Sequence, residues 1–351
     1  MRRSLVALRG HPCCFIALLV FCRQSWSDKL SLPLVLNTWH FPQAASSGWN
    51  ELMGGGSVLD AVHAGCAQCE VDACDGTVGP GGSPDDHGET TLDAMIMDGD
   101  TYDVGAVAGL RRVPSAIGVA RAIMDHTTHT LLVGEAASRF AVSMGFPDLD
   151  LTSNRSRKIF TDWLQATCQP NFYKNVVPNP TKYCGPYKPL VRMTSGESRP
   201  SAQPSWSRGH DTVGMLAVDG NGHIAVATSS NGAVHKISGR VGDSPIPGAG
   251  GYAVGGVGGA VATGDGDTMI RFLPSYQAVE SMRRGMSPRG ACRDALARIQ
   301  KVRPGFFGAL VCANTTGNFG AACSRHGSFT RFTYMVCTAT ACPAAHTISC
   351  E

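Results

Sequence analysis

Residues 209–228 of the chain read Gly-His-Asp-Thr-Val-Gly-Met-Leu-Ala-Val-Asp-Gly-Asn-Gly-His-Ile-Ala-Val-Ala-Thr. Two apolar segments, 212–218 and 223–228, flank the turn sequence Asp-Gly-Asn-Gly at 219–222. Short apolar runs joined by a glycine-containing turn are typical of a β-hairpin. The stretch therefore predicts a pair of buried antiparallel strands that begins at Thr212.

The chemistry of Thr212 depends on whether the chain is cut before it. A cut between Asp211 and Thr212 would give the threonine a free amine beside its own hydroxyl. An α-amino group has an ordinary pKa of about 8, so it can accept the hydroxyl proton near neutral pH. One residue would then supply both nucleophile and base. The alternative interpretation is an ordinary threonine at the start of a strand, since the tripeptide His-Asp-Thr is common.

The residues before this hairpin have a different character. Between Leu190 and Arg208, serine, proline, glycine and arginine dominate and no apolar periodicity is visible. Such a composition predicts an exposed linker. A cut at its end would divide the chain into residues 28–211, which close with the linker 190–211, and residues 212–351, which open with the nucleophile.

Further strands and helices are predicted on both sides of the hairpin. Apolar runs predict strands at 32–38, 91–98, 308–313 and 328–336. Helical spacing predicts a helix capped by Ser57, two helices between 115 and 144, and helices at 277–284 and 289–302. Asp265-Gly266-Asp267 is interpreted as a turn. Runs of strands flanked by helix pairs indicate an α+β fold of helix-covered sheets.

The first 27 residues resemble a secretion signal. Arginines precede an apolar run from Cys14 to Cys22, and small residues follow it. The run is shorter than the roughly 20 residues that span a bilayer, so we expect no membrane partner. Removing residues 1–27 takes away four arginines and no acid, which lowers the formal net charge from +3 to −1. Nucleic acid is therefore not an expected partner.

Eleven of the fourteen cysteines lie after the signal. In an oxidising compartment disulfides are the default for such cysteines. A zinc site from Cys66, Cys69 and Cys74 with His63 or His87 is the alternative, although no second CxxC or HxxxH pattern completes four ligands. His126 and His129 are interpreted as polar residues at a helix end rather than as metal ligands. We expect no metal and no cofactor.

Two sequons agree with passage through the secretory pathway, because glycans are added there to asparagines in such motifs. They begin at Asn154 and Asn314.

Several segments spread over the chain together resemble one known family. They are 36–39 (LNTW), 81–85 (GGSPD), 88–99 (GETTLDAMIMDG), 103–107 (DVGAV), 126–135 (HTTHTLLVGE), 184–189 (CGPYKP), 239–250 (GRVGDSPIPGAG) and 271–280 (RFLPSYQAVE). With them, the chain resembles the aspartylglucosaminidases, or glycosylasparaginases, among the N-terminal nucleophile hydrolases. The resemblance implies a four-layer αββα sandwich, made as an inactive single chain and split by its own threonine.

The resemblance also implies the roles of individual residues. Thr212 matches the nucleophile, and Asp211 matches the residue whose peptide bond is broken. Arg240 and Asp243 match the pair that grips the substrate's α-carboxylate and α-amine, a task that suits a guanidinium fork and a carboxylate. A surface ion pair is the alternative interpretation of that pair.

Four further positions complete the implied site. Thr263 and Gly264 match an oxyanion hole, in which a hydroxyl and a backbone N–H stabilise the tetrahedral intermediate. Trp39 matches a pocket wall. Ser230 stands beside the nucleophile where the family has threonine, and it keeps the hydroxyl.

The implied reaction is cleavage of an asparagine that carries N-acetylglucosamine, which gives aspartate and the sugar amine. The implied setting is the lysosome, with a heterotetramer of two alpha and two beta subunits. The resemblance pairs Cys69 with Cys74, Cys168 with Cys184, Cys292 with Cys312 and Cys323 with Cys350. It leaves Cys66 free and gives no counterpart for Cys337 and Cys342, which either pair with each other or stay idle.

The chain departs from the family at a few positions. Thr77 replaces a serine, Pro80 replaces an aromatic residue, and Val254-Gly255-Gly256 stands where the family carries acids. Two alternatives stay open, of which the first shares the threonine and the clamp and the second rests on the loss of the acids near Val254. One is an asparaginase or isoaspartyl peptidase of the same superfamily, and the other is a catalytically silent secreted binding protein on this scaffold.

Overall fold

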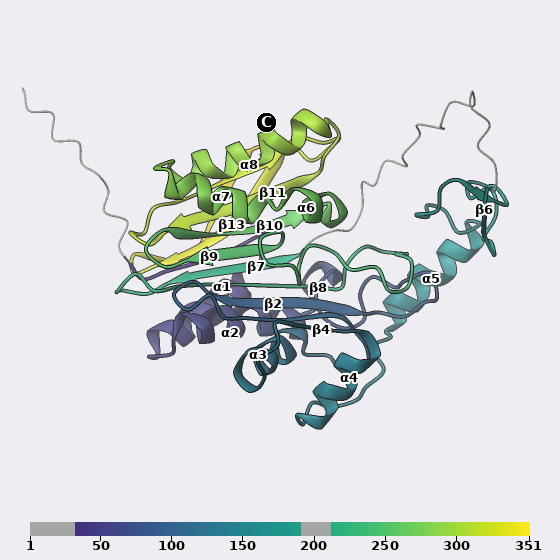
Figure 1. Ribbon diagram of the computed structural model, residues 1–351, viewed down its shortest axis with the longest axis horizontal. Coiled ribbons are helices and arrows are strands. Elements are labelled where there is room, and N and C mark those ends of the chain that lie inside the picture. Colours follow the sequence, from purple (N-terminus) through teal and green to yellow (C-terminus); the bar gives the residue numbers. More distant parts are fainter. Residues whose placement is uncertain (1–31, 191–211) are drawn as a thin grey trace, which may run out of the picture.

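The two apolar runs that begin at Thr212 lie at the centre of a large β-sheet. The computed structural model describes residues 32–190 and 212–351 (Figure 1). The predicted signal at 1–27, nearly all of the predicted linker 190–211, and Asp211 lie outside the described residues. The runs form β7 (Val213–Val218) and β8 (Ile224–Ser230), paired antiparallel from Val213 opposite Ser229 to Val218 opposite Ile224. The predicted hairpin is confirmed.

The large sheet has eight strands in the order β14-β13-β1-β7-β8-β2-β3-β4. The other six are β1 (Leu34–Asn37), β2 (Leu92–Asp98), β3 (Val104–Leu110), β4 (Leu131–Val133), β13 (Arg331–Thr338) and β14 (Ala341–Ser349). Its pairs are antiparallel except for β3 with β4. Residues 32–190 supply β1 to β4 and residues 212–351 supply the rest, so the two parts of the chain interleave in one sheet.

A second sheet packs on one face of the first. Its order is β12-β11-β10-β9, formed by Phe319–Ser324, Gly308–Asn314, Gly258–Gly264 and Gly251–Val254. The helices are α1 (Pro42–Met53), α2 (Val58–Val71), α3 (Ala116–His126), α4 (Gly134–Ser143), α5 (Asn154–Gln165), α6 (Gly266–Phe272), α7 (Pro274–Arg283) and α8 (Pro288–Val302), with a short 3₁₀ turn at Cys74–Gly76. Figure 1 shows α1 to α4 on one side of the sheets and α7 and α8 on the other.

Three apolar cores hold these parts together. One joins α1, α2 and α3 to the outer face of the large sheet, one fills the space between the sheets, and one joins α7 and α8 to the smaller sheet. Along β7, Val213, Met215 and Ala217 face the first core, whereas Leu216 and Val218 face the second. Because both faces are buried, the strand reads as a continuous apolar run.

Most predicted elements are present, with shifted ends. Ser57 caps α2 as predicted, in a capping box with Asp60. His126 and His129 are exposed at the end of α3 and in the segment after it. The predicted turn at 265–267 is wrong, because Asp265 is the N-cap of α6 and its side chain accepts from the N–H of Thr268 at 3.1 Å.

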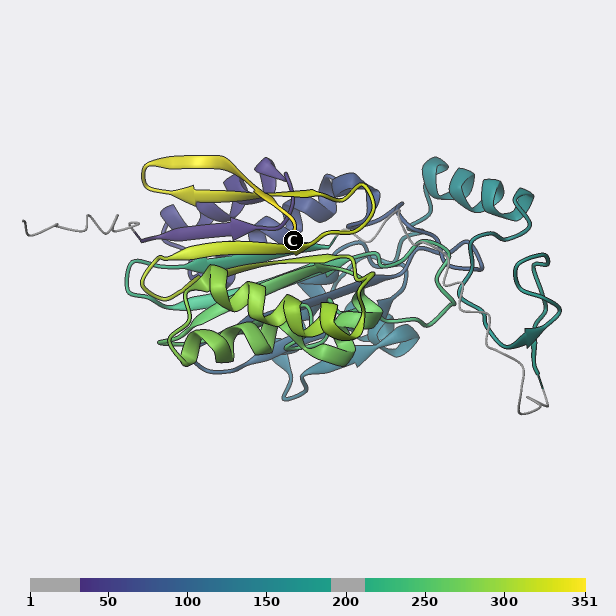
Figure 2. The ribbon, with the colours of Figure 1, turned by 90° about the horizontal axis from the view of Figure 1, so that it is seen from above.

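Helix α5 and the small sheet of β5 (Val176–Val177) and β6 (Lys188–Pro189) stand away from the main body at one end in both views (Figures 1 and 2). The disulfide Cys168–Cys184 links two points of the chain within this protruding part.

Candidate active site

Thr212 lies directly before β7, between β1 and β8, and it is 3% exposed. The hydroxyl of Thr38, at the end of β1, donates to the carbonyl of Thr212 at 2.7 Å and accepts from the N–H of Gly214 at 2.9 Å. One buried hydroxyl thus fixes both sides of the residue that begins the strand.

The hydroxyl of Thr263, at the end of β10, lies beside the backbone nitrogen of Thr212. That nitrogen donates to Thr263 Oγ1 at 3.1 Å, and Trp39 Nε1 donates to the same oxygen at 2.8 Å. Gly264 follows with a φ of +128°, and an added Cβ there would lie 2.5 Å from Gly308 Cα. Only glycine suits this backbone and this close approach. The structure therefore brings Thr212, Thr263, Gly264 and Trp39 together.

A narrow pocket opens on this group. It is about 10 Å³ in volume, close to the space of one water molecule. The hydroxyl of Ser230 accepts from the N–H of Gly232 at 2.9 Å, and Ser244 Oγ lies 3.4 Å from Thr212 Oγ1. The lining residues are Asp93, Thr212, Ser230, Gly232, Arg240, Gly242, Asp243, Ser244 and Gly264.

The two predicted clamp residues lie in the wall of this pocket. Arg240 is largely buried and donates from Nη2 to Asp267 Oδ2 at 2.9 Å. Asp243 is 3% exposed, and its Oδ2 has no hydrogen-bond partner among the described residues. Burial raises the pKa of Asp243 to about 7, although the charge of Arg240 acts against the rise. The pair is not the exposed surface ion pair of the alternative interpretation.

Four residues of this neighbourhood were not predicted as functional. Asp93 and Ser244 lie inside the segments that carry the family resemblance, and Thr38 is next to Trp39 in a third. Their presence in those segments is a signal that could have identified them. Asp267 gave no such signal, because its partner Arg240 is 27 residues away.

The departures from the family pattern lie at different distances from the pocket. The carbonyl of Thr77 accepts from the N–H of Asn231 at 2.8 Å, so Thr77 is next to the Ser230 end of β8. Val254 pairs with Gly258 at the far end of β10 from Thr263. Gly258 and Thr263 are five residues apart in an extended strand, which places Val254 roughly 17 Å from Thr263. Positions 254–256, where the family carries acids, therefore lie away from the site.

The cysteines are bonded in five pairs. All four implied disulfides are formed, and Cys337 is bonded to Cys342. Cys66 is free and buried. Because Cys69 and Cys74 are joined to each other, they are not available as thiolate ligands, and the alternative zinc site is wrong.

The two sequon asparagines are placed differently. Asn154 is exposed at the first turn of α5, while Asn314 closes β11 and its Oδ1 accepts from Thr316 Oγ1 at 2.9 Å. Neither asparagine lies near the pocket residues in the chain.

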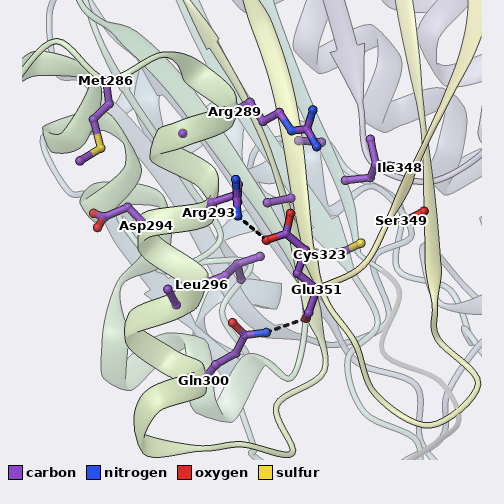
Figure 3. Close-up of a pocket in the computed structure, with 14 residues that line it drawn as sticks. Met286, Arg289, Arg293, Asp294, Leu296, Gln300, Cys323, Ile348, Ser349 and Glu351 are labelled. Atoms are coloured by element: carbon purple, nitrogen blue, oxygen red, sulfur yellow. Dashed lines mark hydrogen bonds and ion pairs between the residues drawn. The ribbon is translucent and has the colours of Figure 1, made fainter.

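Two other features share no residue with the pocket at Thr212. A hollow of about 400 Å³ between α8, β12 and the chain end contains the ion pair of Arg293 with Glu351, at 2.7 Å (Figure 3). It is larger than the pocket at Thr212, but no residue of the predicted site lines it.

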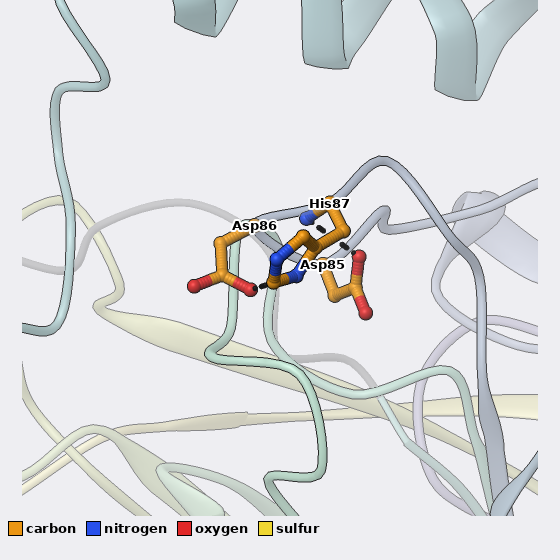
Figure 4. Close-up of side chains that lie close together, drawn as sticks. All are labelled: Asp85, Asp86 and His87. Atoms are coloured by element: carbon orange, nitrogen blue, oxygen red, sulfur yellow. Dashed lines mark hydrogen bonds and ion pairs between the residues drawn. The ribbon is translucent and has the colours of Figure 1, made fainter. Parts of the chain in front are cut away.

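Asp85, Asp86 and His87 cluster in the loop before β2 (Figure 4). Asp85 Oδ1 accepts from the N–H groups of His87 and Glu89, both at 2.9 Å, and Asp86 Oδ1 accepts from the N–H of Ser238 at 2.9 Å. These carboxylates thus hold the backbone of the loop in place.

None of the helices within residues 32–190 and 212–351 is both long and apolar enough to cross a membrane.

The chain is similar to known proteins over most of its length. The model of the asparaginase family matches residues 17–339, so the chain belongs to this family of amide hydrolases. A rat protein named N(4)-(beta-N-acetylglucosaminyl)-L-asparaginase is 59% identical over 305 residues, which cover 87% of this chain and 88% of the rat protein. The mouse protein of that name is 58% identical over the same shares. An Arabidopsis thaliana protein named probable isoaspartyl peptidase/L-asparaginase 3 is 49% identical over 310 residues, 85% of each chain.

Proposed function

We propose that this chain cuts itself between Asp211 and Thr212 and then cleaves the amide that joins N-acetylglucosamine to asparagine, giving aspartate and the sugar amine. The observation that supports this most is the placement of Thr212. Its nitrogen lies 3.1 Å from Thr263 Oγ1 and its hydroxyl lies in a pocket beside an arginine and a buried acid.

The cut would be an N-to-O acyl shift. Thr212 Oγ attacks the carbonyl carbon of Asp211, the C–N bond breaks, and the hydroxyl proton passes to the freed nitrogen. This shift frees the amine of Thr212, and water then hydrolyses the ester, which releases the Asp211 carboxyl group and restores the Thr212 hydroxyl. Ser244 Oγ, 3.4 Å from the attacking oxygen, is placed to share its proton.

The mature threonine would act on the substrate in two steps. The new amine takes the hydroxyl proton while Oγ attacks the side-chain carbonyl of the glycosylated asparagine. Thr263 and Gly264 stabilise the oxyanion, the sugar amine leaves with a proton, and water hydrolyses the β-aspartyl ester. The hydroxyl of Ser230 would complete the polar surroundings of the nucleophile.

The substrate would be held by its free α-groups. Arg240 binds the α-carboxylate, Asp243 binds the α-ammonium, and Trp39 forms a wall. A pocket of about 10 Å³ does not admit this substrate, so the mature form must be wider. A clamp for both α-groups favours free glycoasparagine over intact glycoprotein.

The wider setting is part of the same proposal. The three apolar cores support a four-layer αββα sandwich of the N-terminal nucleophile hydrolase type. The predicted signal and the sequons support secretory passage to the lysosome, with glycans on Asn154 and Asn314. A heterotetramer of two alpha and two beta subunits is the proposed assembly.

A denaturing gel with N-terminal sequencing and an assay of glycoasparagine hydrolysis tests the proposal. The natural protein should give two fragments, one beginning at Thr212, and release aspartate. Thr212→Ala should stay whole and inactive. Thr161→Ala, on the exposed face of α5, is the matched control and should behave like the natural protein. Activity in protein that keeps the 211–212 bond would overturn the mechanism.

The second candidate is an isoaspartyl peptidase or asparaginase, which the name of the Arabidopsis relative favours. Offering glycoasparagine and a β-aspartyl dipeptide to the same preparation separates the two. A strong preference for the dipeptide would favour this candidate. The silent binding protein is less favoured, because the missing acids at 254–256 lie away from the pocket.

A further inference from the structure

We propose that Asp267 is a positioning residue that keeps the two halves of the substrate clamp apart. By engaging Nε and Nη2 of Arg240, it keeps the guanidinium from pairing with Asp243, so that both charges stay available for a zwitterionic α-amino acid. This inference rests on the proposed function of the Arg240 and Asp243 pair.

Among the described residues, the guanidinium of Arg240 donates hydrogen bonds to Asp267 alone, along the edge formed by Nε and Nη2. Nε donates to Asp267 Oδ2 at 3.2 Å and Nη2 donates to the same oxygen at 2.9 Å. The planar fork of arginine makes such a two-nitrogen contact strongly directional. The side chain of Asp267 is 42% exposed while that of Arg240 is 13% exposed, so the acid grips the guanidinium from the solvent side.

The remaining nitrogen, Nη1, faces the pocket. It has no hydrogen bond within residues 32–190 and 212–351, and it lies where two pocket glycines leave space. An added Cβ would be 2.8 Å from Nη1 at Gly242 and 3.2 Å at Gly232. Nη1 is therefore the nitrogen that can meet an α-carboxylate.

Asp243 is a second carboxylate with which Arg240 could pair in place of Asp267. Asp243 Oδ2 is buried and has no hydrogen-bond partner in the described parts of the chain, and Asp243 and Arg240 both lie next to Gly266. An added Cβ at Gly266 would lie 2.5 Å from Asp243 Oδ1 and 3.2 Å from Arg240 Nη2. Without the grip of Asp267, the guanidinium would turn to this unpaired carboxylate, since a buried charge without a partner is costly. The clamp would then neutralise itself.

The position of Asp267 explains how the grip is built. It follows Thr263 and Gly264 by a few residues, in the first turn of α6, whose N-cap is Asp265. The segment that carries the proposed oxyanion hole therefore also sets the direction of the clamp.

The test compares Asp267→Asn with Asp267→Glu and a matched control. Asp125→Asn is the control, because Asp125 also pairs with an arginine, Arg121 at 2.7 Å, but on the surface of α3. Each protein is first checked for a fragment beginning at Thr212. KM and kcat are then measured with glycoasparagine and with its α-carboxamide, which lacks the carboxylate.

We expect Asp267→Asn to raise KM for glycoasparagine about tenfold or more with kcat within about threefold, as lost ground-state binding requires. KM for the carboxamide should match that of the natural protein. Asp267→Glu should give an intermediate KM for glycoasparagine alone, and it serves as the test if the Asn variant does not mature.

An unchanged or lower KM for glycoasparagine would overturn the inference, as would an equal rise for both substrates. Neither result touches the proposed function. That proposal is tested separately, by the Thr212 fragment and by aspartate release in the natural protein.

Discussion

At the scale of single residues, the site depends on hydroxyl groups that serve the backbone as much as the chemistry. Thr38, Thr228 and Ser230 each place an oxygen against a backbone group near Thr212. Thr228 Oγ1, for example, donates to the carbonyl of Ser244 at 2.5 Å. These buried contacts fix the start of β7 relative to the clamp loop, the segment 239–250 that carries Arg240 and Asp243, before any substrate is present.

Thr38 gives a direct test of that rigidity. Replacing Thr38 with Ala leaves the carbonyl of Thr212 and the N–H of Gly214 without their partner, at a cost of about 1–3 kcal/mol. We expect a lower urea midpoint and slower appearance of the Thr212 fragment. Thr38→Ser keeps the hydroxyl and should mature at close to the natural rate. Equal effects of both changes would show that the methyl group matters instead.

Asp243 should make substrate capture depend on pH. Its pKa is raised from 3.8 to about 7, so the empty site holds a protonated, neutral acid below that pH. Only the ionised form binds an ammonium group, so kcat/KM should fall as pH drops below about 7, while kcat, which reports the bound complex, falls less. Asp243→Asn should have a much lower kcat/KM without this limb. A limb that persists in the Asn variant would assign it to another group.

At the scale of helices and strands, patterns of apolar residues predicted the elements whose sequences carry a local signal. The hairpin of β7 and β8 and the capped helix α2 follow from local signals. Strand β10 was not predicted, because Gly258–Gly264 consists of small residues that look like a loop. Its glycines are needed for sheet packing, since an added Cβ at Gly259 would lie 3.1 Å from Leu216, Ile224 and Val226.

The residues of the candidate site divide in the same way, into those that sequence motifs predicted and those that only packing brings together. Its main residues came from motifs that resemble a family, while the contact of Asp267 with Arg240 depends on packing that brings α6 to the clamp loop. No local pattern encodes that contact.

The disulfides near the chain end should differ in their contribution to stability. Cys323–Cys350 closes a separation of 27 residues and Cys337–Cys342 one of 5. In the loop-entropy model, replacing both cysteines by Ala should cost about 3.5 kcal/mol for the longer loop and about 2 kcal/mol for the shorter. Urea unfolding of the two double variants checks this order. A larger loss for the 337–342 pair would mean that packing in β13 outweighs loop entropy.

At the scale of the whole molecule, buried acids make the free energy of unfolding depend on pH. Glu70, on α2, accepts from Ser229 Oγ at 2.6 Å and from the N–H of Ile117 at 2.9 Å, which ties β8 to α3. Burial raises the pKa of Glu70 from 4.5 to about 7. Between these values the folded chain keeps a proton that the unfolded chain releases, so the free energy of unfolding rises as pH falls.

We expect Glu70 to contribute on the order of 2 kcal/mol to this rise between pH 7 and 5. Urea unfolding at the two pH values checks it. Glu70→Gln should reduce the difference between them, leaving the part due to Asp243, which has the same sign. If the two proteins gained equally on acidification, Glu70 would not be the source. An acidic compartment would then owe its stabilising effect to other groups.

The interleaved order of the large sheet has a practical consequence for following maturation. Strands before and after the proposed cut alternate at three seams: β13 beside β1, β1 beside β7, and β8 beside β2. Severing one peptide bond breaks none of these ladders, so the nicked and intact forms should share one hydrodynamic radius and sediment alike. Gel filtration or light scattering would therefore not detect the cut. A preparation that is homogeneous by size could still contain both cut and uncut chains.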